Sequence, residues 1–274
     1  MEGKTRRVGT VELATIESGA GGAPLLAVHG FTGCKEDFAD ELDALGDLGF
    51  HVVAPDLRGH GDSTHLDDEA AYSLESFAAD MWALADDLGW ERFHLIGHSM
   101  GGMVAQVMVL DRPGRVDRLV LMDTHHGVVP GLDADLIEIG VQLARTEGLA
   151  VIQELLKAGA DPTDNPAYHR LCAERPGYQE WAESKMLRAS AVMYASMLQQ
   201  LIGATDRLDL LDSVTSPTLV LVGELDLSFV DASRAMAERI PNAVLDVLAD
   251  AGHSPQFEAA EAWRTSVHGF LRPS

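Results

Sequence analysis

The pentapeptide Gly97-x-Ser99-x-Gly101 is the sequence feature that most constrains the fold. Apolar, β-favouring residues at 93–96 precede it, and an apolar run compatible with a helix follows at 103–110. A serine in a tight strand-to-helix turn has a strained backbone, and larger side chains two residues to either side would collide with the crossing chain. The pattern therefore predicts a sharp turn that presents the Ser99 hydroxyl at the edge of a sheet.

Composition and charge restrict the class of protein. The 274 residues suffice for one α/β domain that buries most of its apolar surface. They include 43 acidic and 20 basic residues, and the formal net charge of −23 argues against nucleic acids and anionic membranes as partners. No run approaches the roughly 18 apolar residues of a membrane span, and residues 1–14 lack the apolar core of a secretory signal. Cys34 and Cys172 lie far apart, so we expect reduced thiols in a cytoplasmic protein.

Predicted strands and helices alternate along most of the chain. Short apolar or alternating runs predict strands at 7–18, 25–28, 51–54, 93–96, 118–122, 218–222 and 243–248. Between and after them, helices are expected at 36–48, 73–88, 103–110, 232–240 and 256–271. This alternation predicts an α/β fold with a doubly wound, mostly parallel sheet.

The alternation is interrupted between residues 125 and 211. This stretch contains helical patterns at 133–145, 149–157 and 178–202, but no convincing buried strand. It could supply additional core helices or form a helical lid inserted into the domain. Because the strand pattern resumes afterwards, we expect an α/β core at 1–124 and 212–274, with 125–211 forming an inserted helical cap.

Three chemically suited residues follow predicted strands. Ser99, Asp226 and His253 each lie just past a strand, and parallel sheets place ligands at the carboxyl ends of their strands. A serine hydroxyl becomes a useful nucleophile when an imidazole takes its proton, and a carboxylate orients that imidazole. Asp123 also ends a strand and is the alternative acid. The sequence favours Ser99, Asp226 and His253 as a catalytic triad.

The chain resembles the α/β-hydrolase superfamily from end to end. The similarity rests on motifs in the usual order: His29-Gly30-Phe31, Asp56-x-Arg58-Gly59-x-Gly61-x-Ser63, Gly97-His98-Ser99-Met100-Gly101-Gly102, Gly223-x-x-Asp226 and Gly252-His253. The resemblance implies an oxyanion hole formed by the backbone N–H groups of Phe31 and Met100. It also implies a cap domain over the site.

Four residues are candidates for the substrate pocket. His125 opens the predicted cap, and Met193 and Met197 lie on a predicted cap helix. Adaptable methionine side chains suit an acyl pocket, although such spacing is also typical of a packed core. His29 precedes the oxyanion loop and could instead support it by hydrogen bonds. We expect no cofactor and no metal, and a small-molecule substrate; a homo-oligomer is compatible with the sequence.

The expected activity is hydrolysis of an ester, thioester, lactone or activated C–C bond through an acyl-enzyme. The expected substrate is small, neutral and moderately hydrophobic. One alternative is a lyase or synthase, because residues 26–33 resemble menaquinone-pathway synthases. Those enzymes usually carry an arginine directly after the elbow glycines, where this chain has Met103. A cofactor-free haloperoxidase and a non-catalytic receptor are further alternatives on the same fold.

Overall fold

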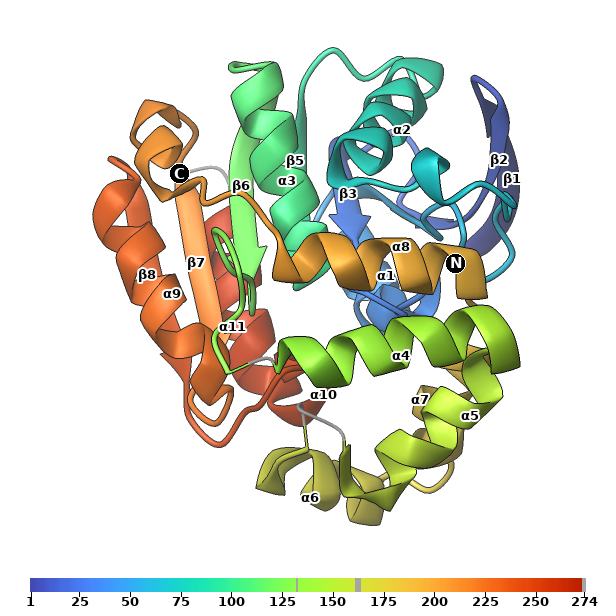
Figure 1. Cartoon of the computed structure of the whole chain (residues 1–274). Coiled ribbons are helices and arrows are strands. Elements are labelled where there is room, and N and C mark those ends of the chain that lie inside the picture. The colour runs from blue at the N-terminus through green and yellow to red at the C-terminus, as the bar shows by residue number, and fades with distance from the viewer. Residues whose placement is uncertain (132, 161–163, 273–274) are drawn as a thin grey trace.

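The computed structural model describes residues 1–131, 133–160 and 164–272, and a sheet of eight strands forms its centre (Figure 1). The strands are β1 Glu2–Val8, β2 Val11–Ser18, β3 Ala23–Val28, β4 Phe50–Pro55, β5 Phe93–His98, β6 Val116–Met122, β7 Thr218–Gly223 and β8 Ala243–Leu248. Their order is β1-β2-β4-β3-β5-β6-β7-β8. Only the pairs β1–β2 and β2–β4 are antiparallel. The predicted doubly wound, mostly parallel sheet is therefore confirmed.

Helices cover both faces of this sheet. They are α1 Ala39–Asp47 and α11 Ala260–Leu271 on one face, and α2 Leu74–Asp87, α3 Met100–Asp111 and α9 Leu227–Arg239 on the other. Leu42 and Trp263 belong to the first apolar core, while Phe77, Val104 and Met236 belong to the second. Four short helical elements lie elsewhere in the chain: η1 Lys35–Phe38, η2 Glu69–Ala71, η4 Leu208–Ser213 and α10 Pro255–Glu258.

A group of helices separates β6 from β7, and we call it the insertion. It comprises α4 Ala134–Glu147, α5 Leu149–Leu155, η3 Leu156–Ala160, α6 Pro166–Glu174, α7 Tyr178–Leu187 and α8 Ala191–Ile202. The described residues between β6 and β7 contain no strand, while positions 132 and 161–163 of the predicted cap range lie outside the described residues. In Figure 1 the arrowheads of β3 and β6 point towards the insertion. The insertion thus lies at the carboxyl ends of the strands.

Two predicted helices are each divided in the structure. The expected helix 178–202 ends at Leu187 and restarts at Ala191, because Ser190 begins a new helix. The Ser190 side chain accepts a hydrogen bond from the Met193 N–H, and its own N–H donates to Gly59 O at 2.8 Å. The expected helix 256–271 is likewise divided, at Ala259, into α10 and α11.

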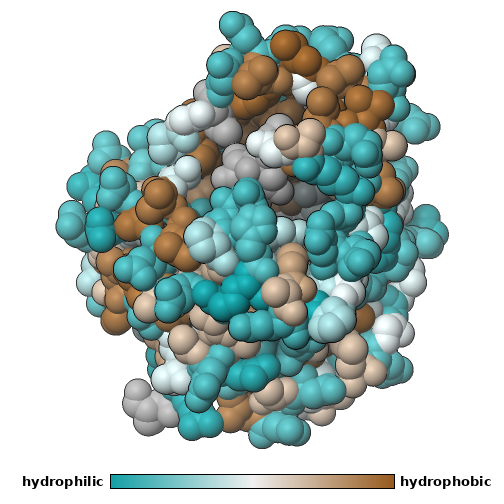
Figure 2. Space-filling model, turned by 90° about the horizontal axis from the view of Figure 1, so that it is seen from below, coloured by the Kyte–Doolittle hydropathy of each residue, from teal (hydrophilic) through white to brown (hydrophobic). Residues whose placement is uncertain are grey.

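The outer face of the insertion carries apolar as well as hydrophilic side chains. Figure 2 shows this mixture in the view from below Figure 1. Leu136 and Ile139 of α4 and Val151 and Leu155 of α5 are exposed. Nevertheless, none of the helices in the described part of the chain has both the length and the apolarity needed to cross a membrane.

Candidate active site

Ser99 lies in a sharp turn between β5 and α3. Its backbone angles are φ 53° and ψ −120°, a conformation rare for a residue with a side chain. A Cβ atom at Gly97 would lie 2.4 Å from Gly101 O, and one at Gly101 would lie 2.3 Å from Val28 O. Both glycines are therefore required by close backbone contact, as the sequence predicted. The turn directs Ser99 to the carboxyl end of the sheet.

His253 lies between a hydroxyl and a carboxylate. Its Nε2 is 3.0 Å from Ser99 Oγ, and its Nδ1 is 2.7 Å from Asp226 Oδ2. The three residues come from different segments: the turn after β5, the start of α9 after β7, and the loop after β8. If the Nδ1–H donates to Asp226, Nε2 is left as the acceptor for the Ser99 hydroxyl proton. The arrangement can therefore activate Ser99 as a nucleophile.

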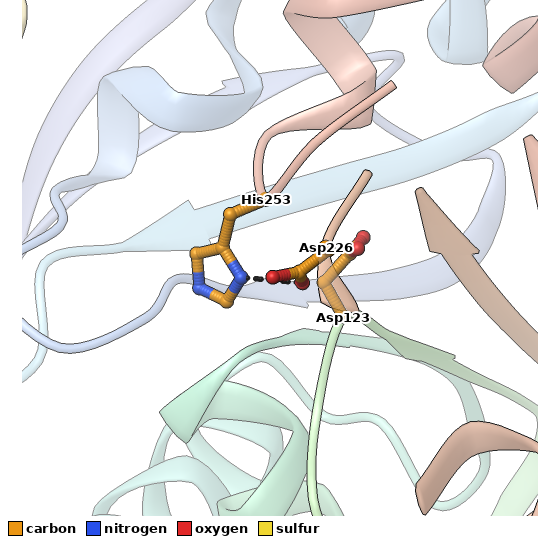
Figure 3. Close-up of side chains that lie close together, drawn as sticks. All are labelled: Asp123, Asp226 and His253. Atoms are coloured by element: carbon orange, nitrogen blue, oxygen red, sulfur yellow. Dashed lines mark hydrogen bonds and ion pairs between the residues drawn. The ribbon is translucent and has the colours of Figure 1, made fainter. Parts of the chain in front are cut away.

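Asp123 lies close to Asp226, but the hydrogen bond of His253 is made to Asp226 (Figure 3). Asp123 is fully buried; its Oδ1 accepts the Gly223 N–H at 2.9 Å, and its Oδ2 has no hydrogen-bond partner among the described residues. Burial, together with the neighbouring Asp226 carboxylate, raises the pKa of Asp123 well above its usual value. Burial and the neighbouring carboxylate therefore favour the protonated form of Asp123.

This cluster is also the place where a metal ion could be considered. One atom of Asp123, one of Asp226 and one of His253 all lie within 4.8 Å of one another. However, metal ligands must be deprotonated, and the raised pKa of Asp123 disfavours its deprotonated form. The Asp226 carboxylate is already hydrogen-bonded to His253. The donor set fits a catalytic hydrogen-bond chain better than it fits a metal.

The loop after β3 passes beside Ser99. A Cβ atom at Gly30 would lie only 2.9 Å from Ser99 Cβ, and Phe31 follows directly. Met100 is the first residue of α3, so its N–H belongs to the helix-end donors that lack an intrahelical acceptor. His29 holds the loop by two hydrogen bonds. Its Nδ1–H donates to Gly30 O at 2.8 Å, and its Nε2 accepts the Leu57 N–H at 3.0 Å. Neither ring nitrogen of His29 is left for a substrate.

Aromatic side chains surround the hydrogen-bond chain. The Phe229 ring lies 4.7 Å from that of His253, and His125 lies 6.5 Å from Phe229. The Tyr194 ring of α8 stacks on Phe31 at 4.9 Å. Tyr194 lies on the predicted cap helix that carries Met193 and Met197, whereas no local sequence pattern distinguishes Phe229 from a core aromatic residue.

The two methionines that are candidates for the substrate pocket pack inside the protein. Met193 and Met197 of α8 are fully buried within the larger apolar core. A Cβ atom at Gly59 would lie 2.7 Å from Met193 Cβ, so this methionine packs on the loop after β4. They are thus part of the contact between α8 and the core domain.

A model of the α/β-hydrolase fold family matches residues 23–260. The chain belongs to the α/β-hydrolase family. Its eight-stranded sheet, the turn at Ser99 and the order of the strands agree with this membership.

Solved structures and curated proteins extend the comparison of this α/β-hydrolase. The enol-lactonase from Burkholderia xenovorans LB400 is 25% identical, with a TM-score of 0.85 over 98% of this chain and 99% of that chain. A thermophilic esterase from Thermogutta terrifontis is 30% identical, with a TM-score of 0.84 over 99% and 98%. Epoxide hydrolase A of Mycobacterium tuberculosis is 35% identical over 128 residues, 45% of this chain and 40% of that protein. The match thus spans less than half of that curated relative. Together, these similarities identify the α/β-hydrolase as an enzyme.

The cations near the site of this α/β-hydrolase are paired with carboxylates. Arg58 bonds Asp80 through two nitrogens, with Nε at 2.6 Å from Asp80 Oδ2. In the insertion, Lys185 Nζ lies 2.7 Å from Asp37 Oδ1. Arg58 therefore anchors its loop, and neither of these two cations is unpaired.

The buried histidines near His253 do not carry a charge at neutral pH. Burial, and then the neighbouring His253, lowers the pKa of His98 to about 3. Burial and His126 lower the pKa of His125 to about 4. His98 Nε2–H donates a hydrogen bond to His253 O at 2.6 Å. This bond holds the backbone of His253.

The rate of this α/β-hydrolase is expected to rise with pH as His253 loses its proton. A protonated imidazole cannot accept the Ser99 proton, so kcat/KM should increase between roughly pH 5 and 8. Because the lowered pKa values keep His98 and His125 neutral over this range, neither of these two histidines accounts for the expected change. The measurement is kcat/KM for a slow ester from about pH 5 to 9. A flat profile would argue against histidine base catalysis.

Proposed function

We propose that the chain is a serine hydrolase with Ser99, His253 and Asp226 as its catalytic triad. The proposed substrate carries an ester, thioester, lactone or activated C–C bond and is small, neutral and moderately hydrophobic. The hydrogen bonds of His253 to Ser99 Oγ at 3.0 Å and to Asp226 at 2.7 Å are the observation that carries the proposal. The similarity to an esterase and an enol-lactonase supports a carboxylic ester hydrolase.

The proposed mechanism has two halves. In the first, Ser99 Oγ bonds to the substrate acyl carbon while its proton moves to His253 Nε2, and Asp226 stabilises the imidazolium. The N–H groups of Phe31 and Met100 donate to the oxyanion. His253 then protonates the leaving group. In the second half, His253 takes a proton from water, which attacks the acyl-enzyme and restores Ser99. These steps require no cofactor.

We propose that residues 125–211 form a cap domain on a core of 1–124 and 212–274. The insertion lies at the carboxyl ends of the strands (Figure 1), and Ser99 directly follows the carboxyl end of β5. Tyr194 of α8 stacks on Phe31 of the oxyanion loop, which brings the insertion into contact with the proposed site. A cap in this position would exclude water from the reaction and supply apolar substrate contacts.

Two measurements test the proposed activity directly. A fluorophosphonate probe should label the wild-type protein at Ser99 and leave Ser99→Ala unlabelled. A panel of p-nitrophenyl esters and lactones should reveal turnover and its dependence on acyl length. Absence of both labelling and turnover would remove the serine hydrolase proposal.

The alternative functions have less support. Met103 stands where the synthases usually carry an arginine, and it is 2% exposed, within the larger apolar core. The chain is also 29% identical to non-heme chloroperoxidase CPO-A1 of Kitasatospora aureofaciens over 85% of both chains. That similarity extends to the whole fold and does not by itself favour one activity.

Neutral substrates are expected to be preferred over anionic ones. The net charge is −23, and the cations near the site are paired, so the field should repel anions. An apolar acyl chain gains about 0.8 kcal/mol per buried methylene. We expect an alkyl ester to exceed its ω-carboxylate counterpart in kcat/KM by at least about tenfold, with a smaller difference at high salt. Preference for the anionic ester at both salt concentrations would favour the synthase alternative.

We propose, from the net charge and the free thiols, a cytoplasmic protein that binds neither nucleic acids nor membranes. Cys34 and Cys172 are free cysteines, which is compatible with a reducing cytoplasm. The acidic surface disfavours nucleic acids and anionic membranes as partners. Association into a homo-oligomer stays a prediction, to be measured by sedimentation or light scattering.

A further inference from the structure

A single carboxylate oxygen bonds the backbone amides on both sides of His253. We call residues 249–254, between β8 and α10, the His253 loop. Glu258 Oε2 accepts the Gly252 N–H at 2.7 Å and the Ser254 N–H at 3.1 Å, and these two residues flank His253 in the chain. Backbone amides that are shielded from water need such an acceptor. Glu258 thus fixes the backbone on both sides of His253.

Helix α6 of the insertion contacts the same loop. Arg170 Nη2 donates to Asp250 O at 2.7 Å and to Glu258 O at 3.1 Å. Asn165, the N-cap of α6, forms a side-chain hydrogen bond with Glu258. The fit is close, because a Cβ atom at Gly252 would lie 2.2 Å from Asn165 Nδ2. The insertion therefore contacts the His253 loop and the end of α10.

An apolar cluster strengthens this contact. Phe257 of α10 packs with Leu171 of α6 and Tyr178 of α7, apart from the two large cores of the sheet. The Phe257 ring lies 5.4 Å from the rings of both Tyr178 and Trp181. Helix α10 has only four residues, so its own hydrogen bonds cannot fix it strongly. Its position depends on packing against the insertion.

We propose that helix α6 of the insertion positions His253 for catalysis, by holding the His253 loop through Arg170 and Glu258. This inference rests on the proposed role of His253 as the general base. His253 must stay within hydrogen-bond distance of Ser99, and a displacement of about 1 Å in an active site can lower a rate by about 10²-fold. The insertion is then part of the catalytic machinery as well as a cover over the site.

Variants of Arg170 and Glu258 test the proposal. Arg170→Ala removes both donated bonds, and Glu258→Ala removes the acceptor of the two loop amides. Glu258→Gln retains an acceptor oxygen of the same reach. The matched control is Arg145→Ala, because Arg145 of α4 also joins the insertion to the core domain, pairing with Glu69 at 2.7 Å away from the His253 loop.

Two readouts separate positioning from general stability. Hydrogen exchange should become faster at Gly252 and Ser254 in Glu258→Ala and Arg170→Ala, but not in Arg145→Ala. With a p-nitrophenyl ester, kcat should fall by about 10- to 100-fold in Glu258→Ala and about tenfold in Arg170→Ala, with KM nearly unchanged. Glu258→Gln should recover most of the loss. If Glu258→Ala does not fold, Arg170→Ala and Glu258→Gln decide the outcome.

The proposal would be overturned by variants that match Arg145→Ala in both exchange and kcat. It would also be overturned if Glu258→Gln recovered nothing relative to Glu258→Ala. Failure of the serine hydrolase proposal is distinguishable, because Ser99→Ala would then keep wild-type turnover. In that case faster exchange would still establish the contact of α6 with the loop, while removing its catalytic consequence.

Discussion

Replacement of Ser99 or His253 by alanine is expected to lower kcat by about 10⁴- to 10⁶-fold. In the proposed mechanism Ser99 supplies the atom that bonds to the substrate. Among the described residues, His253 is the only imidazole within hydrogen-bond distance of the Ser99 hydroxyl. Loss of either removes nucleophilic catalysis, while the oxyanion donors and substrate binding remain. Steady-state kinetics on the best p-nitrophenyl ester measure the effect.

The double variant distinguishes a catalytic unit from two separate contributions. Ser99→Ala/His253→Ala should be little worse than either single change, because the first substitution already disables the unit. Ser213→Ala and His65→Ala serve as controls at exposed positions and should retain wild-type kcat. Losses that add in free energy would mean that Ser99 and His253 do not act together.

Asp226→Asn is expected to lower kcat by about 10⁴-fold, and Asp123→Asn by less than about tenfold. Asp226 accepts the His253 Nδ1–H, and an amide there would favour the wrong tautomer. Burial and the neighbouring Asp226 raise the pKa of Asp123 and so favour its uncharged form, which an amide resembles. Its acceptor for the Gly223 N–H would also be retained.

Comparison of these two variants decides which acid belongs to the triad. Equal melting temperatures for the two proteins would show that differences in kcat do not come from unfolding. A nearly silent Asp226→Asn beside a crippling Asp123→Asn would assign the acid to Asp123. The pair is informative because both carboxyls come from strand ends and lie close together (Figure 3).

Local sequence patterns determined the class of fold and the turn at Ser99. Short apolar runs separated by amphipathic ones predict buried parallel strands and helices, because burial on both faces demands apolar residues throughout. The strand β1 was missed at Glu2–Arg6, since its side chains are mostly exposed and lack apolar alternation. The break at Ser190 was missed because it depends on a hydrogen bond to Gly59, far away in sequence.

Only the tertiary structure decided which residues support the triad. Asp123 and Asp226 both follow strands and have the same chemistry, so the sequence favours Asp226 but keeps Asp123 as the alternative partner of His253. The hydrogen bond of His253 to Asp226 distinguishes the two acids in the structure. The supports of the His253 loop, Glu258 and Arg170, carry no motif. Glu258 acts on nearby backbone amides, whereas Arg170 reaches the loop from a segment 80 residues away. A local pattern can specify a strained turn, whereas contacts between distant segments exist only after the chain has packed.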